Sequence, residues 1–196
     1  NKAAGSCHSL KSPSTHLPMS DAPSFSLSGK VIIQFGGTGL LGRALVDALG
    51  AAGATLIVAS RNREALETLV TSEQARGRTI QVDEVDIGSE ESLQALRDRV
   101  LTQHSRVDGI VFNAVSRPMA CFAGDLDQWR SSMDVNATGF FATVRTFGDA
   151  MAEKGSGSIV NIASQMGTIG MNPWLYEGTS KSPSPDYFFH KRALTH

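Results

Sequence analysis

The chain has 196 residues, enough for one ordinary α/β domain and too few for a second full one, and its hydrophobic fraction of 41% is sufficient for a buried core. Its formal net charge of -1 excludes a strongly basic field of the kind that holds nucleic acid or an anionic membrane. We therefore expect its partners to be small molecules or other subunits.

The cysteine content and the hydropathy of the chain indicate its redox state and its location in the cell. Cys7 and Cys121 are far apart in the sequence and have no metal-ligand or C-x-x-C neighbour, so neither a disulfide framework nor a metal site is indicated. No apolar run approaches the roughly 20 residues that span a bilayer. We expect reduced thiols, a cytoplasmic location and no membrane segment.

Residues 1–28 differ in composition from the rest of the chain. They are rich in Ser and Pro, and Pro13, Pro18 and Pro23 interrupt any helical pattern. We expect a disordered tail here, followed by one domain over residues 29–196. Two alternatives stay open: a transit peptide, which the absence of Arg disfavours, and a native start at Met19.

From Lys30 onward, apolar runs of strand length alternate with amphipathic stretches of helix length. This pattern is typical of repeated βαβ units around a parallel sheet. The expected strands cover residues 31–35, 55–59, 79–85, 109–112 and 158–162, and the expected helices cover residues 40–52, 64–76 and roughly 133–154, with a further helix after Ser89. Right-handed crossovers would wind them into a Rossmann-type doubly wound sheet with three α/β/α layers.

Local signals support these boundaries. Ser89 can cap the helix that follows it, and Leu93, Leu96 and Val100 mark the stripe that this helix buries. Gly155 ends the long helix before the fifth strand.

A glycine-rich turn separates the first strand from the first helix and reads Gly36-Gly37-Thr38-Gly39-Leu40-Leu41-Gly42. Positions without a side chain let the turn tighten and let backbone N–H groups approach a diphosphate at the helix N-terminus. A plain structural turn would also use glycine, but the strand before it and the helix after it favour dinucleotide binding.

This turn resembles the G-x-x-G-x-x-G variant of the short-chain dehydrogenase/reductase family. The resemblance implies that Gly36, Thr38, Gly39, Leu40, Leu41 and Gly42 contact the cofactor. Phe35 departs from the family, which usually has Thr there. We expect the departure to remove a hydroxyl that ties the turn to the Asn113-Ala114 segment.

The end of the second strand bears on the choice of dinucleotide. Ser60, Arg61 and Asn62 offer no carboxylate to a ribose 2′-OH, and Arg61 could pair with a 2′-phosphate, so NADP(H) is favoured over NAD(H). Arg61 could also be an ordinary solvated residue. Asp86 and Ile87 match the family positions that bind the adenine, although an Asp before Gly88 also suits a turn.

Later segments match the family in its own order. Asn113-Ala114-Val115 lies where the family has Asn-Ala-Gly, and loss of that Gly could narrow the cofactor groove. Asn136 matches the family's structural and proton-relay Asn, and a simple capping role is its alternative. The strand at 158–162 leads to Ser164, the position of the family's catalytic serine.

Tyr187 and Lys191 match the family's Tyr-x-x-x-Lys pair. Residues four apart share a helix face, so both can enter one cleft together with Ser164. Tyr176 and Lys181 are five apart in a Gly- and Pro-rich stretch, and we reject them as the catalytic pair.

The resemblance implies hydride transfer between a nicotinamide and a carbonyl or secondary alcohol. A tyrosine phenol ordinarily has a pKa near 10, and a nearby ammonium favours the phenolate, so Lys191 would make Tyr187 a competent acid/base. Lys191 and Tyr187 would also contact the cofactor, Ser164 would bond the substrate oxygen, and Asn136 would anchor a water. Full-length family members are expected to form homodimers or homotetramers.

The connection between Ser164 and Tyr187 is long for an irregular segment. We interpret residues 165–186, with Trp174, Tyr176 and Glu177, as an insertion that covers the substrate. A surface excursion without substrate contact is the alternative. Such an insertion resembles a subgroup acting on sugar acids, polyols or related hydroxy compounds.

Only residues 192–196 follow Lys191, whereas the family continues through at least one more strand-helix-strand unit. We therefore expect a sheet without its last strands, an unprotected fifth strand and weak or no turnover by this chain alone. Two other functions stay open. One is a truncated noncatalytic dinucleotide-binding module, and the other is an extended-type relative such as a nucleotide-sugar epimerase, which Arg61 and Asn113-Ala114 disfavour.

Overall fold

A computed structural model describes residues 25–180 and 184–195. The expected tail at 1–28 therefore lies almost entirely outside the described residues, as does Lys181. The strands are β1 (Val31–Phe35), β2 (Thr55–Ser60), β3 (Gln81–Glu84), β4 (Gly109–Phe112) and β5 (Ser158–Asn161). The helices are α1 (Leu40–Ala51), α2 (Arg63–Ala75), α3 (Glu90–His104), α4 (Leu126–Met133), α5 (Gly139–Lys154) and α6 (Pro185–Ala193), with a π-helical turn η2 (Asp134–Thr138) and 3-10 turns η3 (Gln165–Gly167) and η4 (Pro173–Tyr176).

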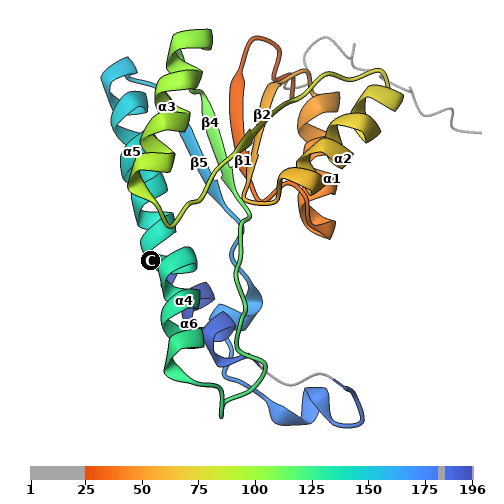
Figure 1. Cartoon of the computed structure of the whole chain (residues 1–196), viewed down its shortest axis with the longest axis vertical. Helices are drawn as coiled ribbons and strands as arrows, with labels where there is room; N and C mark the ends of the chain where they lie inside the picture. Colours follow the sequence, from red (N-terminus) through yellow and green to blue (C-terminus); the bar gives the residue numbers. More distant parts are fainter. Residues whose placement is uncertain (1–24, 181–183, 196) are drawn as a thin grey trace, which may run out of the picture.

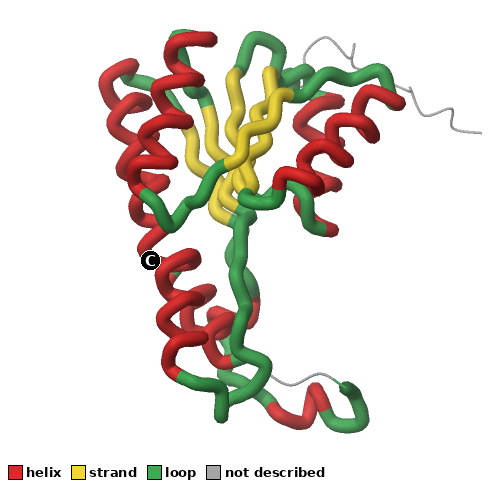
Figure 2. Tube along the Cα trace, viewed as in Figure 1, coloured by secondary structure: helices red, strands yellow, loops and turns green. Residues whose placement is uncertain are grey.

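The strands form one parallel sheet in the order β3-β2-β1-β4-β5. Helices α1 and α2 cover one face, and α3 and α5 cover the other (Figures 1 and 2). The predicted Rossmann-type three-layer fold is confirmed.

Each face of the sheet has its own apolar core because alternate side chains of a strand point to opposite faces. Ile33 and Phe35 of β1 pack with Leu93, Leu96 and Phe147 of α3 and α5. The other face buries Ile32, Val46, Leu56, Leu66 and Leu69 beneath α1 and α2. The stripe predicted for α3, formed by Leu93, Leu96 and Val100, is therefore buried.

Two elements differ from the sequence prediction by more than one residue. The third strand is shorter than residues 79–85, and the helical stretch expected from 133 begins at Leu126, where the Asp125 carboxylate accepts a hydrogen bond from Gln128 N at 2.9 Å. Only Ser132 of α4 is buried, so this helix has no apolar stripe for periodicity to detect.

Helices α4 and α6 lie beyond the carboxyl ends of the strands (Figure 1). Helix α6 is joined to β5 because Asn161 Nδ2 donates to Leu194 O at 2.8 Å and Lys191 Nζ donates to Ile162 O. A Cβ on Gly167 would lie 2.5 Å from Lys191 O, so η3 can pack against α6 only with glycine there. These contacts place α6 beside the segment that follows β5.

Strand β5 pairs with β4 and, among the described residues, with no strand on its other side. Ile159 and Val160 are exposed, and an apolar groove of about 420 Å³ runs beside them along β4. The expectation of an unprotected fifth strand agrees with this arrangement. In the part of the chain described, no helix combines the length and apolar character that a bilayer crossing requires.

His190 is almost fully buried on α6, with 1% of its surface exposed. Its burial, and secondarily the charge of Lys191, lower the pKa of this imidazole from 6.5 to about 4, while Asp186 opposes the shift. Below pH 6.5 the unfolded chain therefore binds a proton that the folded chain does not.

We predict that this imidazole removes about 2–3 kcal/mol of the free energy of unfolding as the pH falls from about 6.5 to about 4. Urea unfolding across this pH range should show a shallower decline for His190→Gln than for the unmodified protein. The matched change His104→Gln, which leaves His190 in place, should keep the original slope. An unchanged slope in His190→Gln would contradict the assignment.

Candidate active site

The glycine-rich turn lies directly against the segment that follows β4. Gly36 has a φ of +80°, and a Cβ there would be 2.6 Å from Ala114 N. A Cβ on Gly42 would be 2.2 Å from Gly36 O, so the first turn of α1 also packs on this backbone. The two close approaches explain why these positions require glycine.

Phe35 was expected to remove a hydroxyl that connects the turn to the Asn113-Ala114 segment. Other groups supply this connection. Asn113 Nδ2 donates to Gly36 O at 2.9 Å, and Asn113 N donates to Phe35 O at 3.0 Å. Phe35 is fully buried, and its ring packs against those of Phe112 and Phe147 with centroids 6.0 and 5.9 Å apart. The turn is thus held without a threonine hydroxyl.

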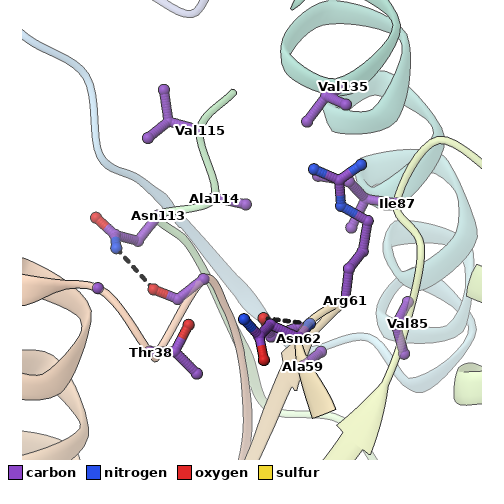
Figure 3. A pocket seen from close by; sticks show the side chains of 13 residues that line it. Thr38, Ala59, Arg61, Asn62, Val85, Ile87, Asn113, Ala114, Val115 and Val135 are labelled. Atoms are coloured by element: carbon purple, nitrogen blue, oxygen red, sulfur yellow. Dashed lines mark hydrogen bonds between the residues drawn. The ribbon is translucent and has the colours of Figure 1, made fainter. Parts of the chain in front are cut away.

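A first cavity of about 320 Å³ opens at the carboxyl ends of β1, β2 and β4 (Figure 3). The strand order reverses direction between β1 and β4, and such switch points are where open parallel sheets bind ligands. The lining residues are Gly36, Thr38, Gly39, Ala59, Ser60, Arg61, Asn62, Val85, Ile87, Asn113, Ala114, Val115 and Val135. Val115, which was expected to narrow the cofactor groove, lines this cavity and leaves it open.

Ten of the predicted cofactor residues line this cavity and six do not; two of these six, Tyr187 and Lys191, lie on α6. Leu40 and Leu41 are exposed at the start of α1, and Gly42 is buried beneath the turn. Asp86 is exposed, and its carboxylate accepts a hydrogen bond from Gly88 N at 3.0 Å, which is the turn role considered as its alternative.

Sequence reasoning missed three lining residues, Ala59, Val85 and Val135. Each directly precedes a predicted site residue or its segment. Extending each predicted segment by one position toward its strand or helix would have found them.

Arg61 extends from the end of β2, and its guanidinium lies on the side of the first cavity where Ile87 and Val135 are found (Figure 3). Among the described residues it makes no ion pair, whereas Arg63, two positions later, pairs with Glu67 at 3.0 Å. Asn62 caps α2 by accepting a hydrogen bond from Ala65 N at 2.9 Å. The Arg61 charge is therefore uncompensated at the rim of this cavity.

A second cavity of about 500 Å³ contains Ser164 and Tyr187 in its wall. Arg117, Gln165, Met166, Tyr176, Ser184 and Phe188 complete the lining. Lys191 is buried behind it, with Nζ 5.9 Å from the centroid of the Tyr187 ring. The structure thus brings Ser164, Tyr187 and Lys191 together as predicted from their order in the chain.

The environment of Lys191 favours loss of its proton relative to an exposed lysine. Burial, and secondarily the charge of Arg117, lower the pKa of the Lys191 ammonium. The carbonyl of Ile162 accepts its hydrogen bond, which directs Nζ along the wall behind Tyr187.

Asn136 lies in the π-helical turn η2 and is buried. Its Oδ1 accepts a hydrogen bond from Ser116 N at 2.9 Å, and its Nδ2 donates to Ser116 O at 2.7 Å and to Ser132 Oγ at 3.0 Å. The amide therefore clamps the backbone of Ser116 in place. Contact with a relay water stays a prediction for this residue.

The two cavities are close to each other. Val115 lines the first and Arg117 lines the second, and two residues of extended chain span at most about 7 Å. A ligand occupying the first cavity can therefore reach toward Ser164 and Tyr187 in the second.

The segment between Ser164 and Tyr187 contributes unequally to the second cavity. Tyr176 is half-buried and lines it, whereas Trp174 is 79% exposed and Glu177 is exposed, and neither lines it. Of the three residues named for a covering insertion, only Tyr176 is thus placed to contact a ligand there. The rejected pair cannot be compared directly because Lys181 lies outside the described residues.

Comparisons with known proteins identify the family to which a chain with this fold and these motifs belongs. A model of the short chain dehydrogenase family matches residues 30–183. The 2,5-dichloro-2,5-cyclohexadiene-1,4-diol dehydrogenase of Sphingobium indicum is 40% identical over 149 residues, covering 74% of this chain and 58% of that enzyme. D-threitol dehydrogenase of Mycolicibacterium smegmatis is 30% identical over 158 residues, covering 80% of this chain and 61% of that enzyme. The crystal structure of an NAD⁺-bound xylitol dehydrogenase superposes with a TM-score of 0.74 at 25% identity, covering 86% of this chain and 62% of that one.

The chain thus spans about 60% of the length of these two curated relatives. The family model nevertheless extends over most of the chain, including both the glycine-rich turn and the segment after β5. With its parallel sheet and its adjacent cavities, the chain belongs to the short-chain dehydrogenase/reductase family of oxidoreductases.

Proposed function

We propose that this chain carries the cofactor site and the acid/base residues of an NADP(H)-dependent oxidoreductase that interconverts a secondary alcohol and a carbonyl compound. The observation that carries the proposal is the convergence of Ser164 and Tyr187 on one cavity, with Lys191 behind the phenol ring. Family membership also favours a homodimer or homotetramer and a cytoplasmic location.

The residues around the first cavity fit a dinucleotide. Gly36 and Gly42 let the turn close against Ala114 and against the first turn of α1. A Cβ on Gly39, which lines the cavity, would meet nothing within 4 Å, so the backbone of the turn is open there to a diphosphate. Ile87 and Ala114 offer apolar surface on either side, and Arg61 offers a cation at the β2 end. When bound, the dinucleotide supplies the hydride acceptor or donor.

Within the second cavity the protein handles the proton. In the reduction direction, the Tyr187 O–H bond breaks and a new O–H bond forms on the substrate oxygen, while the Ser164 hydroxyl donates a hydrogen bond to the same oxygen. The Lys191 ammonium stabilises the phenolate that remains. Oxidation runs these proton steps in reverse.

Asn136 acts on this site through the backbone. By clamping Ser116 it fixes the short segment between the two cavities, so that the cofactor site and the proton-transfer site keep a constant relation. Gly167 and Asn161 do the same for α6, which carries Tyr187.

Arg61 favours NADP(H), because its uncompensated guanidinium can form charge-assisted hydrogen bonds with a 2′-phosphate. We predict that Arg61→Ala weakens NADPH binding by about 10- to 100-fold and changes NADH binding by no more than about threefold. Fluorescence titration of both cofactors measures this difference.

Arg63→Ala provides the matched control, because Arg63 is exposed on α2 and pairs with Glu67 outside the first cavity. Its NADPH affinity should equal that of the unmodified protein. Equal losses of NADPH and NADH affinity in Arg61→Ala, or no loss of either, would disprove the 2′-phosphate contact.

The acid/base assignment predicts that Tyr187→Phe lowers turnover by about 100-fold or more while NADPH affinity stays unchanged, since the phenol transfers a proton and the turn binds the diphosphate. Turnover should be measured under single-turnover conditions at high protein concentration with a panel of carbonyl substrates.

Tyr176→Phe tests the rival tyrosine of the same cavity and should lower turnover by less than about tenfold. Undiminished turnover in Tyr187→Phe would eliminate the proposed role. Cofactor binding with no turnover in any protein, including the unmodified one, would instead indicate a noncatalytic dinucleotide-binding module.

A further inference from the structure

Arg117 lies beside the proposed acid/base in the second cavity. Its Cζ atom is 5.1 Å from the centroid of the Tyr187 ring, and its side chain forms part of the cavity wall together with Ser164. A cation in this position is within reach of a substrate whose oxygen is bonded to Tyr187 and Ser164.

Apart from its contact with the Tyr187 ring, the charge of Arg117 has no partner in the described part of the chain. Eight other arginines have a carboxylate oxygen within ion-pair distance, namely Arg63, Arg76, Arg78, Arg97, Arg99, Arg106, Arg130 and Arg145. Among the described residues the Arg117 guanidinium forms no ion pair and no hydrogen bond, and it lies over the Tyr187 ring. Its donors are therefore available to a ligand.

Among the described residues, the second cavity also has no acidic side chain in its wall. Its described lining includes Arg117 but no Asp or Glu, and the buried ammonium of Lys191 lies behind it. Asp186, which is near on α6, is buried, and its Oδ1 accepts hydrogen bonds from Tyr187 N and from Ser184 Oγ. The wall facing a ligand therefore has net positive charge, which favours an anion.

The backbone from which Arg117 projects is fixed. Asn136 holds both the N–H and the carbonyl of the preceding residue, Ser116, at 2.9 and 2.7 Å. On the other side of Arg117, Ser184 Oγ lies 2.9 Å from Met119 O and shares its single hydrogen between this carbonyl and Asp186 Oδ1. A guanidinium attached to an immobilised segment can hold a planar anion with a smaller loss of entropy.

We propose that Arg117 binds a carboxylate of the substrate, so that the second cavity selects hydroxy acids or oxo acids, such as polyhydroxylated sugar acids, over their neutral counterparts. This inference rests on the proposed function, which identifies the second cavity as the substrate site. Arg117 is then a specificity-determining residue that aligns the reacting carbon with Tyr187.

The test compares matched pairs of ligands that differ in one carboxylate: gluconate with glucitol, xylonate with xylitol, and threonate with threitol. Isothermal titration in the presence of saturating NADP⁺ gives the affinity for each. The unmodified protein should bind the acid of at least one pair about tenfold or more tightly than its neutral partner. Arg117→Met should lose that preference, and Arg117→Lys should keep part of it.

Arg130→Met is the matched control, since Arg130 is exposed on α4 and pairs with Asp127 away from the second cavity. Its affinities should match those of the unmodified protein within about twofold. Equal binding of acid and neutral ligand by the unmodified protein, or an equal loss of both in Arg117→Met, would overturn the proposal. Binding is read separately from turnover. Absence of turnover in the unmodified protein would contradict the oxidoreductase function, whereas the carboxylate contact of Arg117 is decided by the affinities alone.

Discussion

The close contact between the glycine-rich turn and the segment after β4 is the constraint on which the rest of the site depends. Gly36 can approach Ala114 only because it has no side chain, and Asn113 then fixes the approach with a hydrogen bond to Gly36 O. Parallel pairing of β1 with β4 brings both segments to the same edge of the sheet. The first cavity therefore opens where the strand order changes direction, and every later feature is positioned relative to it.

The second cavity is built by long-range contacts that extend this arrangement. Asn136, from the π-helical turn, holds the chain that leaves β4, while Asn161 and Gly167 hold α6 against the chain that leaves β5. These contacts bring Tyr187 and Ser164 into one wall although they are distant in sequence. The proposed proton-transfer groups thus stand on elements beyond the sheet, close to the first cavity.

The sequence predicted the sheet, its two covered faces and the convergence of Ser164 with Tyr187. Apolar periodicity and the order of motifs can both be read from one sequence without an alignment. It missed the start of α4, whose polar residues follow no buried stripe. It also missed the replacement of a threonine hydroxyl by Asn113 and the position of Arg117 over the Tyr187 ring. Both depend on contacts between segments that meet only after folding.

The central claim is that one dinucleotide lies across the turn and extends toward the phenol. A crystal structure of the protein with NADP⁺ tests it most directly. We expect the diphosphate to lie against the backbone of the turn from Gly36 to Gly42. We expect the nicotinamide ring to lie between Ser164 and Tyr187, with Lys191 at its ribose. A diphosphate bound away from this turn, or a nicotinamide directed away from Tyr187, would contradict the account.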